Sequence, residues 1–307
     1  MLHLSRWISL LLALTLQAGL TACGSPPPEA PENGEASGQE QTVQEESGEE
    51  GPQQSAPSSA DGWVTGGTET DRGFVLDNVL HSETEGDIHF NLYVPDTYDG
   101  SRPVAVFFTL PGYEGLYFQG VGANLQEDFA FEAMAYDGDM IIVAPQLSDW
   151  GETSARQTTA LAEYILESYN IDRNRVYANG YSGGGETMSQ VMGMRPDLFT
   201  AYLHCSSQWD GDYAPVVESR TPVYLVVGEG DEYYGAGPTQ EAYDQLHALY
   251  QAEGLTEEEI GRLLVLDIKD ADYFRAGGAP NQHGGGNLFA RDPEIMGWLF
   301  QQEKSGD

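Results

Sequence analysis

The residues with the clearest chemical signature lie in the run Gly180-Tyr181-Ser182-Gly183-Gly184. The run follows a β-rich stretch at 175–178 and precedes a segment with helical character. A serine between glycines at a sharp strand-to-helix turn presents its hydroxyl at the helix N-terminus, the arrangement of a serine nucleophile. We predict that Ser182 is this nucleophile and that the backbone N–H of Gly183 faces a developing oxyanion. Phosphate or dinucleotide binding does not fit, because the run has neither a Walker lysine nor a G-x-G-x-x-G pattern.

A nucleophilic serine needs a histidine base, and at a turn of this kind the base follows the serine in the chain. Beyond the strand expected at 223–227, the histidines are His247 and His283. His247 lies in a helical run, whereas His283 lies in the glycine-rich loop 281–286, after the last expected strand. We therefore predict His283 as the base.

The base in turn needs a carboxylate that orients it. Parallel sheets place their sites at the carboxyl ends of strands. Glu229, Asp231 and Glu232 all follow the strand at 223–227, and all three are candidates on this ground.

The loop after the strand expected at 104–108 is the place for a second oxyanion donor. Its sequence is Leu110-Pro111-Gly112-Tyr113. The backbone N–H of Tyr113 is the predicted donor, and that of Gly112 is the alternative. Aromatic side chains that follow other strand ends are predicted to line the substrate cleft, namely Trp150, Trp209, Tyr233 and Tyr234.

Elements that position these residues alternate along the chain from Gly62 onward. Two early strands, at 74–76 and 88–94, have an antiparallel character. Apolar β-rich runs then predict buried strands at 104–108, 140–143, 175–178, 201–203, 223–227 and 263–266. Helical patterns separate several of them. This alternation predicts an α/β protein with a mostly parallel central sheet and helices on both faces.

The motif and its partners are similar to those of one enzyme family. Residues from about 88 to 302 resemble the esterase branch of the α/β hydrolases, which includes feruloyl and acetylxylan esterases, polyhydroxybutyrate-depolymerase-like enzymes and the catalytic domains of prolyl oligopeptidases. The resemblance implies an α/β-hydrolase fold. It also favours Asp231 as the acid, because this fold has a G-x-x-D spacing, so that the implied triad is Ser182, Asp231 and His283. Pro111 departs from the family's usual His-Gly, and no long insertion lies between 203 and 223, where many lipases carry a lid.

The function expected from these residues is hydrolysis of a carboxylic ester through an acyl-enzyme, with short-acyl, carbohydrate-linked or phenolic esters as substrates. No metal or organic cofactor is expected, since no metal-ligand spacing is present. A prolyl-oligopeptidase-like peptidase is the alternative with the same triad. A non-catalytic binding lipoprotein is a further alternative, against which the complete triad argues.

The N-terminal part has a different composition. Residues 1–22 have the pattern of a signal peptide, and Leu20-Thr21-Ala22-Cys23 resembles the lipobox of bacterial lipoproteins. This predicts an extracytoplasmic protein that is anchored to the membrane through lipidated Cys23. Residues 23–61 are predicted to be an acidic, disordered tether, because eight glutamates and almost no apolar residues follow the cysteine. Residues 62–307 are the predicted catalytic domain.

Net charge and cysteine content bear on two further points, the binding of nucleic acid and the state of Cys205. The formal net charge is −36, which repels nucleic acid, so no nucleic-acid partner is expected. Apart from Cys23, the chain has one cysteine, Cys205, in an apolar run. A buried, inert thiol is expected there.

Overall fold

The computed structural model describes residues 62–304. The predicted signal peptide at 1–22, the lipidation site Cys23 and the tether at 23–61 lie outside the described residues. In the described range no helix is both long and apolar enough to span a bilayer.

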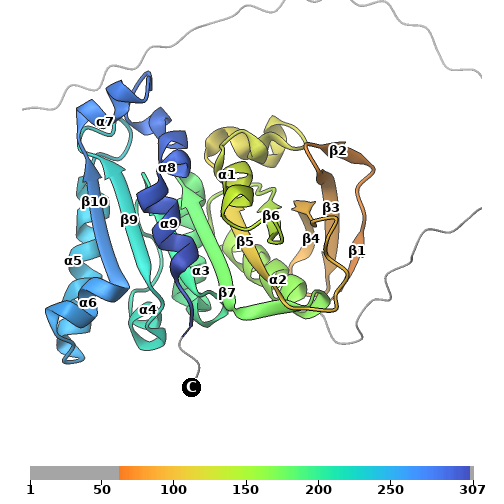
Figure 1. Ribbon diagram of the computed structural model, residues 1–307, viewed down its shortest axis with the longest axis horizontal. Coiled ribbons are helices and arrows are strands. Elements are labelled where there is room, and N and C mark those ends of the chain that lie inside the picture. Colours follow the sequence, from red (N-terminus) through yellow and green to blue (C-terminus); the bar gives the residue numbers. More distant parts are fainter. Residues whose placement is uncertain (1–61, 305–307) are drawn as a thin grey trace, which may run out of the picture. The chain divides into compact units, whose positions relative to one another are not determined.

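A ten-stranded sheet forms the centre of the described part (Figure 1). Its strands are β1 (Trp63–Thr65), β2 (Glu69–Asp71), β3 (Phe74–Ser82), β4 (Gly86–Tyr93), β5 (Val104–Leu110), β6 (Ile141–Pro145), β7 (Ile171–Tyr181), β8 (Ala201–Cys205), β9 (Val223–Gly228) and β10 (Leu264–Lys269). The order is β1-β3-β4-β6-β5-β7-β8-β9-β10, with β2 paired to β3. Strands β1 to β4 pair antiparallel, as does β4 with β6, and the remaining pairs are parallel. The predicted mostly parallel sheet is confirmed.

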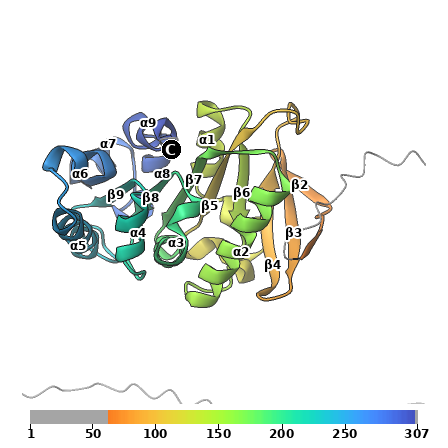
Figure 2. The ribbon, with the colours of Figure 1, turned by 90° about the horizontal axis from the view of Figure 1, so that it is seen from below.

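Helices cover both faces of this sheet (Figure 2). One face carries α2 (Glu152–Ser168), α3 (Gly183–Met194), α4 (Ala214–Ser219) and α5 (Gly237–Ala252). The other face carries α1 (Phe129–Tyr136), α8 (Asn287–Arg291) and α9 (Pro293–Gln301). The helices α6 (Glu257–Leu263) and α7 (Ala271–Ala276) flank β10 in the chain.

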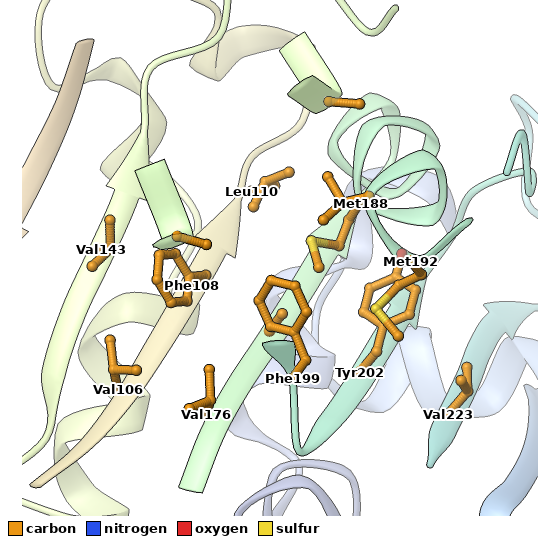
Figure 3. Packing of buried hydrophobic residues seen from close by; sticks show 14 of the residues in the cluster. Val106, Phe108, Leu110, Val143, Val176, Met188, Met192, Phe199, Tyr202 and Val223 are labelled. Atoms are coloured by element: carbon orange, nitrogen blue, oxygen red, sulfur yellow. The ribbon is translucent and has the colours of Figure 1, made fainter. Parts of the chain in front are cut away.

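Each face of the sheet buries its own hydrophobic core. Figure 3 shows part of the core on the α3 side, to which Val106 and Phe108 of β5, Val176 of β7, and Met188 and Met192 of the helix belong. All five side chains are buried. Strands of a parallel sheet are covered on both faces, so they are apolar almost throughout. This is why continuous apolar runs in the sequence predicted their positions well.

The antiparallel edge differs from the prediction in its extent. Strand β3 continues to Ser82, whereas the sequence predicted a strand only at 74–76. A register irregularity lies between Val75 and Asn78, and Asp77 has a φ of 56° there. Burial nevertheless alternates along the whole strand, and it is the polar pair Asp77-Asn78 that breaks the apolar pattern and explains the early end of the predicted strand. The short strands β1 and β2 have no apolar pattern and were not predicted.

The parallel half of the sheet brings three connections to one edge. Strand β7 leads into α3 through Ser182, β9 leads into the loop with Asp231, and β10 precedes the segment with His283. Because β7, β8, β9 and β10 are consecutive neighbours with parallel directions, their carboxyl ends face the same side. Binding sites of open α/β sheets lie at this side.

Candidate active site

The turn at Ser182 has a strained backbone. Its φ is 54° and its ψ is −125°, an arrangement that costs a non-glycine residue roughly 1–3 kcal/mol. Close packing requires glycines around it: a Cβ on Gly180 would lie 2.4 Å from the carbonyl oxygen of Gly184, and one on Gly184 would lie 2.5 Å from that of Leu110. The strain is held by the Ser182 N–H, which donates to the Cys205 carbonyl at 3.0 Å. This turn fixes the serine at the start of α3.

Three of the predicted residues form one hydrogen-bonded chain. The hydroxyl oxygen of Ser182 lies 3.0 Å from Nε2 of His283. Nδ1 of His283 lies 2.8 Å from Oδ2 of Asp231. Since a carboxylate only accepts, Nδ1 carries the hydrogen, and Nε2 of the neutral ring is left to accept from Ser182. The geometry is that of a nucleophile, a base and an orienting acid.

Asp231 is buried, with 5% of its surface exposed. Its Oδ1 accepts from the backbone N–H groups of Tyr233 at 3.0 Å and Tyr234 at 2.9 Å. Burial raises the pKa of this carboxyl, but the hydrogen bonds from His283 and from both backbone N–H groups outweigh it and hold the pKa below its usual value. Asp231 is therefore ionised while it orients the ring.

The other two carboxylates considered for the acid have different partners. Oε1 of Glu229 accepts from the backbone N–H of Ala271 at 3.0 Å. The carboxylate of Glu232 accepts from the backbone N–H groups of Gln282 and His283, with Oε2 2.9 Å from each nitrogen. Glu229 thus ties the acid loop to α7, and Glu232 holds the backbone of the histidine loop rather than its ring.

Tyrosine rings surround the imidazole of His283. Tyr181 stacks on it, with ring centroids 5.8 Å apart, and its hydroxyl donates to the His283 carbonyl. Tyr233 and Tyr234 lie 5.4 and 5.6 Å from it. A Cβ on Gly286 would lie 2.0 Å from the Tyr181 ring, so this close approach requires glycine. The histidine loop is therefore fixed by packing as well as by Glu232.

The two predicted oxyanion donors come from different elements of the fold. The N–H of Gly183 is the first of α3, at the end of a helix where N–H groups have no acceptor within the helix. Tyr113 lines the same pocket as Ser182. The alternative donor, the N–H of Gly112, is engaged by Oε1 of Glu127 at 3.1 Å. The Gly112 N–H is therefore already paired, and the role of the Tyr113 N–H as the second donor stays a prediction.

A pocket of about 600 Å³ opens over Ser182 and His283. Of the predicted lining residues, Trp150, Tyr233 and Tyr234 all contribute to its wall. The Trp150 ring packs directly on Gly183, since a Cβ there would lie 2.3 Å from it.

Trp209 does not line this pocket, and its prediction was wrong. Its side chain is 9% exposed and stacks on Tyr213, with centroids 5.5 Å apart. It also packs against His204 and Tyr202. The residues directly after β8 are buried: Ser206 and Ser207 are fully buried, and the Ser207 carbonyl accepts from the Thr239 hydroxyl at 3.1 Å. Position after a strand end therefore did not imply exposure to the cleft.

Three carboxylates in the pocket wall were not predicted: Glu114, Glu127 and Glu186. Glu186 lies four residues after Ser182 on α3, and its Oε1 accepts from the hydroxyl of Tyr234 at 2.7 Å. This i, i+4 spacing from the nucleophile was a usable signal. Glu127 approaches from a distant loop and no motif marks it. Burial raises the pKa of Glu127 to about 7, and it raises the pKa of Glu186 as well.

Residues 62–304 contain no cluster of three or more His, Cys, Asp or Glu side chains placed to hold a metal ion. Cys205 is a free, buried thiol whose pKa is raised by burial. His204 is fully buried beside it, and burial lowers its pKa to about 4. Neither side chain lines the pocket at Ser182.

Comparison with known proteins identifies several similar chains. Residues 147–212 match the model of the prolyl oligopeptidase family. Feruloyl esterase B from Thermothelomyces thermophilus is 28% identical over 153 residues, which cover 44% of this chain and 49% of that protein. The chain thus spans about half the length of this curated relative.

Two solved structures are similar in fold. A thermostable esterase superposes with a TM-score of 0.60 and 19% identity, covering 76% of this chain and 63% of that one. A glucuronoyl esterase from Solibacter usitatus superposes with a TM-score of 0.53 and 10% identity, covering 80% and 88%. At these identities the likeness is one of fold.

Proposed function

We propose that this chain, a serine hydrolase with the α/β-hydrolase fold, cleaves carboxylic esters through a Ser182-His283-Asp231 triad. The single observation that carries the proposal is the hydrogen-bonded chain from the Ser182 hydroxyl through His283 to Asp231, with steps of 3.0 and 2.8 Å. The partial match to feruloyl esterase B supports ester chemistry.

The mechanism follows from the partners of each atom. Ser182 attacks the ester carbonyl while Nε2 of His283 takes its proton. Asp231 stabilises the imidazolium and keeps the hydrogen on Nδ1. The N–H groups of Gly183 and Tyr113 donate to the oxyanion. His283 then protonates the leaving alcohol, and a water molecule activated by the same ring releases the acid from Ser182.

The substrates that we propose are short-acyl, phenolic or carbohydrate-linked esters. Aromatic side chains in the wall, Trp150 and Tyr233 among them, suit flat phenolic groups and sugar rings. After β8 the chain reaches β9 through one short helix, α4. This connection holds no large lid, which supports access by extended substrates.

Hydrolysis of p-nitrophenyl acetate, butyrate and octanoate by the full-length protein tests this function, with Ser182→Ala as the matched variant. The expected result is turnover that is lost in the variant while its circular dichroism spectrum is unchanged. Equal rates for both proteins, or none for either, would contradict the proposal, and inertness would support a binding role.

A peptidase is the second candidate, favoured by the match of residues 147–212 to the prolyl oligopeptidase family. The same triad would then cleave an amide. A proline-containing chromogenic peptide distinguishes the two functions when its kcat/KM is compared with that of the acetate ester on the same preparation. A higher kcat/KM for the peptide would assign the peptidase function.

We also propose that the protein is a lipoprotein, anchored outside the cytoplasm through Cys23. The lipobox-like run 20–23 supports this proposal. Expression of the full chain with labelled palmitate, beside Cys23→Ala, tests it. Label and membrane fractionation should both be lost in the variant, and an unlabelled wild-type protein would refute the anchor.

A further inference from the structure

The pocket over Ser182 contains three carboxylates and no lysine or arginine. Glu114, Glu127 and Glu186 contribute to its wall, and His283 is its one basic side chain. Within residues 62–304, none of the three carboxylates forms an ion pair with Lys, Arg or His. We infer that the pocket selects esters that carry a positively charged ammonium group close to the scissile bond. This inference rests on the proposed esterase function and names its substrate class.

Glu186 is the carboxylate whose place relative to the nucleophile is best defined. It lies one helical turn after Ser182 on α3. One oxygen accepts from the Tyr234 hydroxyl at 2.7 Å, which fixes the side chain across the pocket between α3 and the acid loop. The carboxylate is half-buried, so its charge is screened less than that of a surface group. A cation in the pocket would be attracted to it.

Glu127 supplies an independent observation. Its Oε1 accepts from the Gly112 N–H, but its Oε2 is buried and has no hydrogen-bond partner among the described residues. Buried polar atoms are nearly always paired, so an orphaned carboxylate oxygen in a pocket wall points to a missing partner. Burial, with a smaller contribution from the nearby charges of Glu114 and Asp128, raises the pKa of Glu127 to about 7, and a bound cation would lower it again.

Aromatic faces complete a surface that suits ammonium groups. Trp150 lies against Gly183, and Tyr113 and Tyr233 are 56% and 74% exposed. Cations bind over the faces of tryptophan and tyrosine, and quaternary ammonium groups are recognised by such rings. Neutral sugars would use the same rings, but they gain little from three carboxylates that have no ion-pair partner. An anionic substrate would be repelled.

The test compares p-nitrophenyl esters that differ in charge. The cationic ester is 4-(trimethylammonio)butanoate, its neutral isostere is 5,5-dimethylhexanoate, and the anionic ester is the glutarate monoester. At low salt, kcat/KM of the full-length protein should be on the order of tenfold higher for the cationic ester than for its isostere. The anionic ester should be the slowest of the three. In 1 M NaCl the ratio should fall, because the Debye length is then about 3 Å.

Matched variants show which charges cause the ratio. Glu186→Gln should reduce the cationic-to-neutral ratio at least about threefold. Glu114→Gln should reduce it less, because the Glu114 side chain is exposed and its charge is more screened. Glu218→Gln removes the same charge from an exposed site outside the pocket and should leave the ratio unchanged. A ratio near one in wild type, or a ratio that the pocket variants do not change, would overturn the inference while leaving the esterase function intact.

Binding provides a readout that does not depend on turnover. Quenching of tryptophan fluorescence in Ser182→Ala should report binding of phenyltrimethylammonium, and benzenesulfonate should bind at least about tenfold more weakly. Equal binding of the two probes would overturn the inference even if no ester were hydrolysed. Inertness toward all three esters with selective binding of the cation would contradict the esterase function and support the cation site.

Discussion

Replacement of Asp231 by Asn removes one negative charge and moves the ring hydrogen of His283 from Nδ1 to Nε2. The Oδ1 atom accepts from two backbone N–H groups, of Tyr233 and Tyr234, which require an oxygen at that place. The Asn amide oxygen will therefore stay with them, and the NH2 group will face Nδ1 of His283. Nδ1 must then accept, so the ring hydrogen moves to Nε2, which faces the Ser182 hydroxyl and is no longer able to take its proton.

The expected loss in kcat for Asp231→Asn is on the order of 10³ to 10⁴, equivalent to about 4–5.5 kcal/mol of transition-state stabilisation. KM should change little, because Asp231 has 5% exposure and is shielded from substrate by the histidine ring. The assay is p-nitrophenyl acetate hydrolysis with active-site titration to count functional molecules.

Glu232→Gln and Glu229→Gln are the matched controls. Both carboxylates accept only backbone N–H groups, and a glutamine oxygen is able to accept the same bonds. Each variant should lose less than about tenfold in kcat, which is 1.36 kcal/mol. If Asp231→Asn keeps more than a tenth of wild-type kcat, or if Glu232→Gln loses as much, the assignment of the acid is refuted.

Three other outcomes follow from burial and packing. Folding raises the pKa of Glu127 from 4.5 to about 7, so the folded protein binds this proton more tightly and loses stability as pH rises through that range. Glu127→Gln should therefore raise the free energy of unfolding by about 2–3 kcal/mol at pH 8 and change it little at pH 4, measured by thermal unfolding. Gly184→Ala places a Cβ 2.5 Å from the Leu110 carbonyl and should cost about 1–3 kcal/mol in urea, whereas Gly261→Ala, with open space in α6, should be neutral or stabilising. Cys205 should resist Ellman's reagent until guanidinium unfolds the chain, and rapid native labelling would contradict its burial.

The mostly parallel sheet with helices on both faces was predicted from the sequence, because parallel strands covered on both faces are largely apolar. The α/β-hydrolase fold was implied by the resemblance, and both predictions are confirmed. Ser182 was predicted from a glycine-rich motif with strict steric requirements. His283 was predicted by elimination, since only two histidines follow the strand at 223–227. The choice among Glu229, Asp231 and Glu232 needed the resemblance, because neighbours in a loop differ only in backbone geometry that residue types do not encode.

Other features depend on contacts between distant segments. Glu127 reaches the oxyanion loop from fifteen residues beyond Gly112, and only the fold brings them together. Trp209 was placed in the cleft because it follows a strand end, yet packing with Tyr213 and His204 buries it. In irregular loops, tertiary packing decides where a side chain points, and no sequence pattern predicts this.

Ser182 and His283 are separated by 101 residues in the chain and by 3.0 Å in space. During synthesis, the serine is made long before its base, and the last neighbouring strand, β10, also precedes that base. In the proposed mechanism, a growing or incompletely folded chain therefore exposes a serine with no partner to activate it, and hydrolysis would begin only when the histidine loop has packed on Tyr181. Turnover per molecule is thus a measure of how many chains have finished folding.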